Sequence, residues 1–413
     1  MAASVEAPPY RPGPSAETDA PGRGLGGTVR NRPRPDYDPI GNSIGALHIF
    51  PGIAVGVDYD SNIDRSDTAE RAGLLARVRP TLRIVTDWSR HALEVSAEAE
   101  SGEYPVYRRE SYLDAAARAA GRIDIGHGLK AEAGLGLAHL YEPRGGVDDA
   151  GGAEPVRFLQ WSAEGALSLQ SGRFAYTIGT AVKRLDFNDV PAQGGGSLNQ
   201  DDRDSQTWSV EARIDYEPLP DTGVYLTGRY GLIDFAAATD DSSINRDGRL
   251  QQIVAGTELD LGGVTVLNLA VGWMGHQFAD ARLQPVMGLA ISGDVTVNVT
   301  ALTTVTGALT RDLSATVTPG ASSYTQTAAR LQVDHELLRN LLLSASIAGR
   351  RLDFHGVDRR DTHGGVSVGA EWLVNRLARL SFHYELGQRL SEGSAATHDW
   401  LRQAVMLRLE LQR

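Results

Sequence analysis

The chain of 413 residues has no cysteine, only two lysines among its 40 basic residues, and no apolar run of about eighteen residues. The missing apolar run excludes a transmembrane helix, which needs about 20 apolar residues. The absence of cysteine suits an oxidising envelope compartment, although many cytosolic proteins share it. A net charge of -12 argues against a nucleic-acid partner. The ten histidines show no ligand spacing, so neither a metal nor a cofactor is expected.

The first residues also lack an apolar core segment. Residues 1–34 are rich in Pro, Gly, Ala and Arg, which predicts a flexible arm over residues 1–42, followed by one domain over residues 43–413. Gly22 to Gly27 match the G-x-G-x-x-G pattern but follow no strand, so the arm is again the better interpretation. No export leader is visible; for an envelope protein, we expect that a leader has been removed or that the true start lies upstream.

The C-terminal stretch of the chain alternates apolar and polar residues. From Leu401 to Leu411 the odd positions are mostly apolar, while Arg402, Arg408 and Glu410 lie on the other face. This period of two predicts a strand, and the run around Phe382 repeats it to make a hairpin. In a soluble sandwich the apolar face would pack a core, whereas in a membrane barrel it would meet lipid and the charged face would line a lumen.

The same alternation continues through the chain. It predicts about eighteen strands, an even number as a single-chain bacterial barrel requires, joined alternately by short turns and long polar loops. A β-propeller or several sandwiches would need continuous apolar strands or a repeat, and neither is seen. The predicted fold is an all-β, single antiparallel transmembrane β-barrel. Besides a first strand from Ser43, a hairpin around Arg77 to Glu100 and the final hairpin, strands are expected at 107–123, 128–142, 156–170, 173–187, 205–218, 222–237, 249–261, 264–279, 284–296, 301–312, 323–337, 340–353 and 361–374.

Charges on the inward positions suggest a register. In an antiparallel pair, opposed residues have a constant sum of position numbers, and one register opposes Arg77 to Glu100, Arg79 to Glu98 and Arg83 to Glu94. The same reasoning opposes Glu371 to Arg379 and Glu385 to Arg402. Arginine suits such fixed pairs because its planar fork binds carboxylates. The predicted lumen-lining residues are Arg77, Arg79, Arg83, Glu94, Glu98, Glu100, Glu211, Arg213, Asp215, Arg330, Glu371, Arg379, His383, Glu385, Arg402, Arg408 and Glu410.

Several stretches resemble the outer-membrane β-barrel porins called porin 2, found in Gram-negative envelopes. The similarity runs from about Arg32 to the C-terminus, and the matching motifs lie in order on the predicted turns and strand ends. It implies an outer-membrane barrel, a role near exported polysaccharide, and no catalytic residues. One departure is the C-terminal residue, Arg413, where outer-membrane barrels often end in an aromatic. The stretches are Arg32-Pro-Arg-Pro-Asp-Tyr-Asp-Pro-Ile-Gly41, Asp58-Tyr-Asp-Ser-Asn62, Thr86-Asp-Trp-Ser-Arg-His-Ala-Leu93, Val333-Asp-His-Glu-Leu-Leu-Arg-Asn340 and Arg359-Arg-Asp361.

Two motifs have weaker claims. Ser367 and Ser43 fit the G-x-S-x-G pattern of a hydrolase nucleophile, but the Ser367 motif lies within a period-two run rather than a strand–turn–helix, so no enzyme is expected. Asp58, Asp60 and Asp64 are spaced like the ligands at odd-numbered positions of a calcium-binding loop. The stretch lacks the glycine and the final glutamate of that motif, which favours a solvated outer loop. The tryptophans Trp161, Trp208, Trp273 and Trp372 fall on the outward phase and are expected at the bilayer interface.

Three functions fit these observations. The first is a porin-like channel in the cell outer membrane that passes small or carbohydrate solutes. The second is a dedicated polysaccharide-export barrel that works with a periplasmic partner, which the Pro-rich arm would bind. The third is a structural or adhesive barrel whose lumen is closed. The expected partners are the outer-membrane lipid bilayer and a small-molecule or polysaccharide solute.

Overall fold

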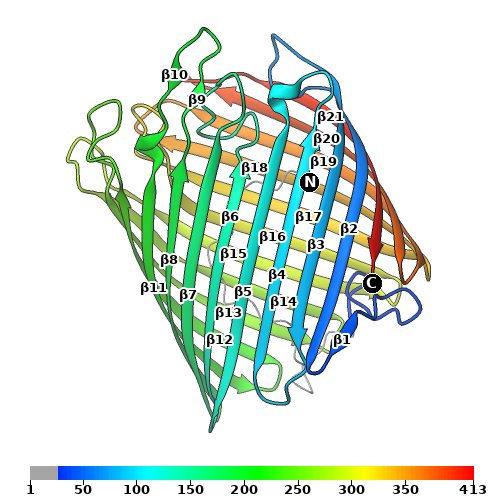
Figure 1. Ribbon diagram of the computed structural model, residues 1–413. Helices are drawn as coiled ribbons and strands as arrows, with labels where there is room; N and C mark the ends of the chain where they lie inside the picture. Colours follow the sequence, from blue (N-terminus) through cyan, green and yellow to red (C-terminus); the bar gives the residue numbers. More distant parts are fainter. Residues whose placement is uncertain (1–26) are drawn as a thin grey trace.

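The computed structural model describes residues 27–413. Its main sheet has nineteen strands, of which eighteen form the wall and the three-residue β1 (Asn42–Ile44) is an appendage on β2. Each wall strand pairs antiparallel with its neighbours along the chain, and the first wall strand, β2, also pairs with the last, β21. The wall is therefore a closed barrel (Figure 1).

The elements follow one another in simple up-and-down order. The wall strands are β2 (Leu47–Asp60), β3 (Gly73–Thr86), β4 (Ala92–Glu103), β5 (Tyr112–Gly126), β6 (Leu129–Tyr141), β7 (Arg157–Ser171), β8 (Phe174–Phe187), β11 (Ser205–Leu219), β12 (Thr222–Phe235), β13 (Gly248–Leu261), β14 (Thr265–Phe278), β15 (Val286–Thr300), β16 (Thr303–Ala315), β17 (Ser323–Leu338), β18 (Leu341–His355), β19 (Arg360–Asn375), β20 (Ala378–Glu392) and β21 (Trp400–Gln412). The loops contain β9 (Val190–Pro191), β10 (Ser197–Leu198) and two short 3-10 helices, η1 (Arg108–Glu110) and η2 (Asp201–Arg203).

Side chains alternate between the two faces of the wall, as the period of two dictates. In β21, Val405 and Leu407 are exposed on the outside, whereas Ala404 and Met406, which alternate with them, are buried. The predicted tryptophans follow this pattern, since Trp208 and Trp372 are about half exposed on the outer face. Over residues 27–413 the structure contains no helix long and apolar enough to cross a lipid bilayer.

The two ends of the barrel differ. At one end the strands are joined by tight turns such as Gly172–Arg173, and at the other by longer loops such as residues 142–156 and 188–204. Both β2 and β21 reach the turn end, where the dark-blue N-terminal residues lie beside the C-terminus in Figure 1. In outer-membrane barrels the short turns face the periplasm and the long loops face outward.

The predicted all-β barrel of about eighteen strands is confirmed. Most predicted boundaries differ from the observed ones by a few residues, and two of these differences involve inward charges. β2 continues to Asp60, whose carboxylate pairs with Arg402 of β21 on the inner wall. The strand predicted from residue 107 begins at Tyr112, since η1 precedes it and turns Glu110 inward.

Candidate functional site

The inner wall of β3 and β4 carries the predicted arginine–carboxylate ladder. Arg77 Nη1 lies 2.9 Å from Glu100 Oε1, and Arg83 Nε lies 3.0 Å from Glu94 Oε1. Arg79 pairs with Glu98 between them. All three predicted ion pairs are therefore present in the structure.

The predicted register of this hairpin is wrong by two residues. Arg83 is directly opposite Ser96, and Glu98 is directly opposite Thr81, so each arginine reaches its partner diagonally. Diagonal neighbours lie about 7–8 Å apart at their Cα atoms, a gap that long side chains span. A shift of two keeps every side chain on the same face, which explains why the faces were right and the pairing was not.

The final strands show the same diagonal pairing. Arg379 Nε lies 3.1 Å from Glu371 although its direct partner is Leu373, and Arg402 Nη1 lies 3.2 Å from Glu385 although its direct partner is Gly387. Here too the predicted partners meet while the predicted register is wrong by two residues. The shift is thus a common feature of these three hairpins.

The remaining predicted residues also occupy the inward phase. Glu211 accepts from Arg229 Nε at 3.0 Å, which joins β11 to β12. Arg213 bridges to β13 through Glu258 at 2.7 Å and pairs with Asp215 at 2.6 Å. Arg330 donates to Gln332, Glu410 lies 4.0 Å from Arg379, and His383 and Arg408 stand opposite glycines, Gly369 and Gly56.

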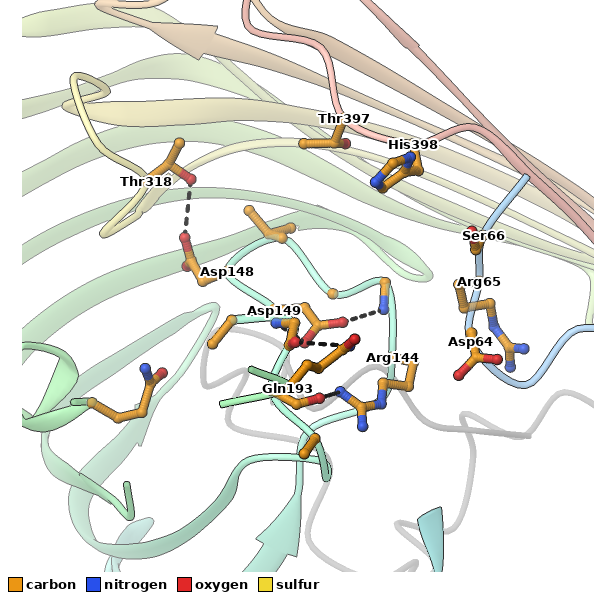
Figure 2. Close-up of a pocket in the computed structure, with 18 of the residues that line it drawn as sticks. Asp64, Arg65, Ser66, Arg144, Asp148, Asp149, Gln193, Thr318, Thr397 and His398 are labelled. Carbon is orange, nitrogen blue, oxygen red and sulfur yellow. Dashed lines mark hydrogen bonds between the residues drawn. The ribbon is translucent and has the colours of Figure 1, made fainter. Parts of the chain in front are cut away.

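The long loops enclose a cavity of about 1380 Å³ at the outer mouth (Figure 2). Its lining combines arginines and carboxylates from loops that are far apart in sequence, including Arg65, Arg144, Asp149 and His398. Sequence reasoning did not find this cavity, because the loops were interpreted only as polar connections.

Loop 142–156 crosses the mouth. It leaves the wall between β6 and β7, yet its Asp148 accepts hydrogen bonds from Thr316 at 2.6 Å and Thr318 at 3.2 Å, in the loop between β16 and β17. Eight wall strands separate the two loops on one side and ten on the other, so they are nearly opposite. Figure 2 shows the Asp148–Thr318 contact. A Cβ on Gly145, whose φ is +72°, would stand 2.8 Å from Arg65, so the crossing is close-packed.

Buried ion pairs anchor this crossing loop. Arg144 Nε donates to Glu110 at 2.9 Å, and Glu110 also accepts from Arg71 at 3.1 Å. At the base of the loop, Glu142 accepts from Arg203 at 2.8 and 3.0 Å. Burial raises the pKa of Glu142 above its ordinary value, and the Arg203 guanidinium only partly opposes that effect. The loop is therefore held by pairs shielded from solvent rather than by exposed contacts.

A second segment lines the inner mouth. Residues 27–41, which we term the strap, bind the inward face at the turn ends of β16 to β21. Val29 N–H donates to Thr304 Oγ1 at 3.0 Å, and Arg34 Nη2 lies 2.9 Å from Glu336. Arg30 pairs with Asp334 at 2.7 Å. Arg376, Gln412 and β1 continue the contacts toward β2. The basic residues of the predicted arm could have suggested these acidic partners, but nothing local indicates which ones.

The two weaker motifs acquire ordinary structural roles. Ser367 lies within β19 and shares a hydrogen bond of 2.8 Å with Ser346 on the neighbouring strand, without the turn and helix that a nucleophile needs. The solvated outer loop expected for the acidic stretch is wrong at Asp58 and Asp60, which are buried at the end of β2. There Asp58 pairs with Arg77 at 2.7 Å and Asp60 with Arg402 at 2.9 Å. Guanidinium groups thus compensate the charges that a calcium ion would have needed.

Comparisons with known proteins bear on this barrel. Among solved structures, the chain is similar to the outer membrane protein OpdK of Pseudomonas aeruginosa, at 11% identity and a TM-score of 0.48, covering 88% of this chain and 99% of that one. It is also similar to the ferric enterobactin receptor PfeA of Pseudomonas aeruginosa, at 8% identity and a TM-score of 0.46, covering 88% and 80%. The copper transporter OprC is similar at 11% identity and a TM-score of 0.48, covering 90% and 81%.

No curated protein matches the sequence. The family model described as "Putative beta-barrel porin 2" matches residues 34–413, which are nearly the whole chain and every wall strand. The resemblance inferred from the sequence is confirmed, and with it the location in the outer membrane. The chain belongs to this family of outer-membrane β-barrel porins.

Proposed function

We propose that the protein is a channel that passes small or carbohydrate solutes across the outer membrane, through a lumen lined by paired arginine and carboxylate side chains. It carries out no catalysis of its own. The observation that carries this proposal is the inward-facing ladder of Arg77, Arg79 and Arg83 with their glutamates on β4. Such a wall is costly to hold against lipid and is readily solvated by water in a lumen.

The size of the barrel supports the same function. Barrels of 16–18 strands leave an aqueous channel that side chains alone do not fill. The outer cavity of about 1380 Å³ exceeds the roughly 300–1,000 Å³ of an ordinary small-molecule pocket, which suits a water-filled entrance.

The two mouths favour small solutes over a polymer. Loop 142–156 crosses the outer mouth through Asp148, and the strap covers part of the inner mouth through Arg34. A chain of linked sugars would have to displace both. Polysaccharide export with a periplasmic partner therefore stays a prediction, and a closed, adhesive barrel stays the alternative that conductance tests.

The experiment is a planar-bilayer recording in a salt gradient. In the native channel each inward charge is largely compensated, so we expect modest selectivity. Replacing Glu94, Glu98 and Glu100 by glutamine leaves Arg79 and Arg83 without their partners in a water-filled space, while Arg77 keeps Asp58. Folding should therefore survive, and the reversal potential should move toward that of an anion-selective pore.

A matched control removes three exposed carboxylates from the connections, by Glu70→Gln, Asp87→Asn and Asp221→Asn, with the same change in net charge. This variant is expected to keep the native reversal potential. If the purified protein shows no conductance, the channel function is refuted. If the two triple variants shift alike, the β4 glutamates do not line the conducting path.

A further inference from the structure

Three arginines lie on the lipid-facing side of the wall, at the loop ends of β16, β18 and β19. Arg311 is directly opposite Thr327, which is directly opposite Arg351, so the three side chains share one face. That face is the outer one, because Leu309 and Ile347, at even spacing from these arginines on the same strands, are exposed apolar residues. Arg360 adds a third guanidinium on β19.

The arginines are gathered around one carboxylate. Asp353 lies 3.0 Å from Arg351 Nη2 and 2.7 Å from Arg360 Nε, and both arginine side chains are about half exposed. Arg311 donates to Thr327 Oγ1 at 2.6 Å instead. Glu392, opposite Arg360, and Asp358, in the adjoining loop, both lie near Arg360 at the edge of the patch, so Arg311 and Arg351 stand farther from these two carboxylates.

The patch lies at the level of the outer-leaflet head groups. At the turn end, Leu341 of β18 is opposite the exposed Trp372, and Arg351 follows ten residues later on the same strand. With a rise of about 3.4 Å per residue and a tilt of about 40°, this separation spans about 26 Å along the membrane normal. The apolar band of such barrels is about 25 Å tall, so the arginines stand just beyond its outer edge.

We propose that Arg311, Arg351 and Arg360 bind the phosphate group of a phosphorylated lipid in the outer leaflet. A guanidinium fork matches phosphate oxygens bidentately, and an arginine that already shares a carboxylate keeps other N–H donors free. Thr327 and Thr362, which are direct partners of Arg351, place hydroxyl groups in the same row. Basic residues at a membrane surface attract anionic head groups.

The test measures lipid binding by the full-length, detergent-solubilised barrel and does not depend on conductance. The probes are mixed vesicles of phosphatidylcholine with diphosphorylated lipid A, and vesicles with the same lipid A after enzymatic dephosphorylation. We expect preferential binding to the phosphorylated form. The variant Arg311→Gln, Arg351→Gln, Arg360→Gln should bind it roughly a hundredfold more weakly.

The matched control carries Arg157→Gln, Arg184→Gln and Arg249→Gln, three exposed outward arginines elsewhere on the loop-end rim, and is expected to bind like the native protein. Equal losses in both triple variants would show general attraction to the rim and overturn the proposal. So would equal binding to the dephosphorylated lipid, or full competition by inorganic phosphate at the same concentration, which would indicate a site for free anions. If the triple variant does not fold, Arg311→Gln alone, which leaves Asp353 paired, must weaken binding at least several-fold.

Discussion

Replacing Arg34 by alanine should release the strap from the inner mouth. The Arg34 and Glu336 side chains are 5% and 1% exposed, and their atoms lie 2.9 Å apart. Removing one partner of a buried ion pair costs about 3–5 kcal/mol, because the other charge stays buried without compensation. Arg32, at 3.6 Å from the same carboxylate, offsets only part of that cost. We therefore expect the docked state of the strap to become more than about 100-fold less favourable.

Limited trypsin digestion measures this release directly. Within the strap, Arg32 and Arg34 precede prolines and resist trypsin, so Arg30–Asn31 is the bond to follow. In the docked strap Arg30 is held by Asp334 at 2.7 Å and Glu371 at 3.5 Å. When opening is fast relative to cleavage, the cleavage rate follows the population of the open form, so it should rise by about the same factor.

The control is Arg339→Ala. Arg339 lies 3.5 Å from the same Glu336 carboxylate, but its side chain is 77% exposed, so its loss should cost less than about 1 kcal/mol. Cleavage at Arg30 should then stay close to the native rate. Equal cleavage of native protein and Arg34→Ala would refute the reasoning, since the strap would then be held by something other than its buried arginine.

Three further predictions follow from the wall and the loops. Leu407→Arg places a charge on the lipid face and should block assembly at a cost of about 2–4 kcal/mol, whereas Arg408→Leu on the inner face should assemble. Heat-modifiable migration on gels distinguishes assembled from unassembled barrels. Equal assembly of the two variants would show that the assignment of the inner and outer faces is wrong. Asp148→Ala should free the crossing loop and raise single-channel conductance, and an unchanged conductance would place the constriction elsewhere. Burial would raise the pKa of Asp240, but the Ile244 amide and the Arg246 guanidinium hold that pKa below its ordinary value of 3.8. The ionised carboxylate should therefore protect its loop from hydrogen exchange down to about that pH, and the protection should fall only at lower pH. Loss of protection between pH 7 and 5 would contradict a lowered pKa.

The wall was predictable because its signal is local. Alternation along β21 places Leu407 outward and Arg408 inward whatever strand lies beside it. The ion-pair partners were also predictable, since Arg83 and Glu94 flank one short turn and each needs a counter-charge. The register was not, because a shift of two residues preserves every face and every pairing that long side chains can reach.

The contacts at the two mouths of the barrel could not be predicted either, and the reason is different. Asp148 finds Thr316 across the barrel, and Arg34 finds Glu336 after 302 residues of chain. These contacts depend on the completed wall, which brings distant loops over one opening. Composition alone makes the strap look like a linker, since its prolines, glycines and arginines carry no periodicity. For the lipid-facing arginines, alternation gives the side of the wall, but their grouping around Asp353 needs three strands in register.

The strap also bears on the order in which the barrel is built. Its contacts begin on β16 and β17, continue over the turn after β19 and the end of β21, and finish at β1 beside β2. It therefore spans the seam where the first and last wall strands meet. Its N-terminal residues are translated first, yet their binding surface exists only once the last third of the chain has paired. Docking of the strap and closure of the seam thus depend on the same late strands, so an intact Arg34–Glu336 pair marks a barrel that has finished assembling.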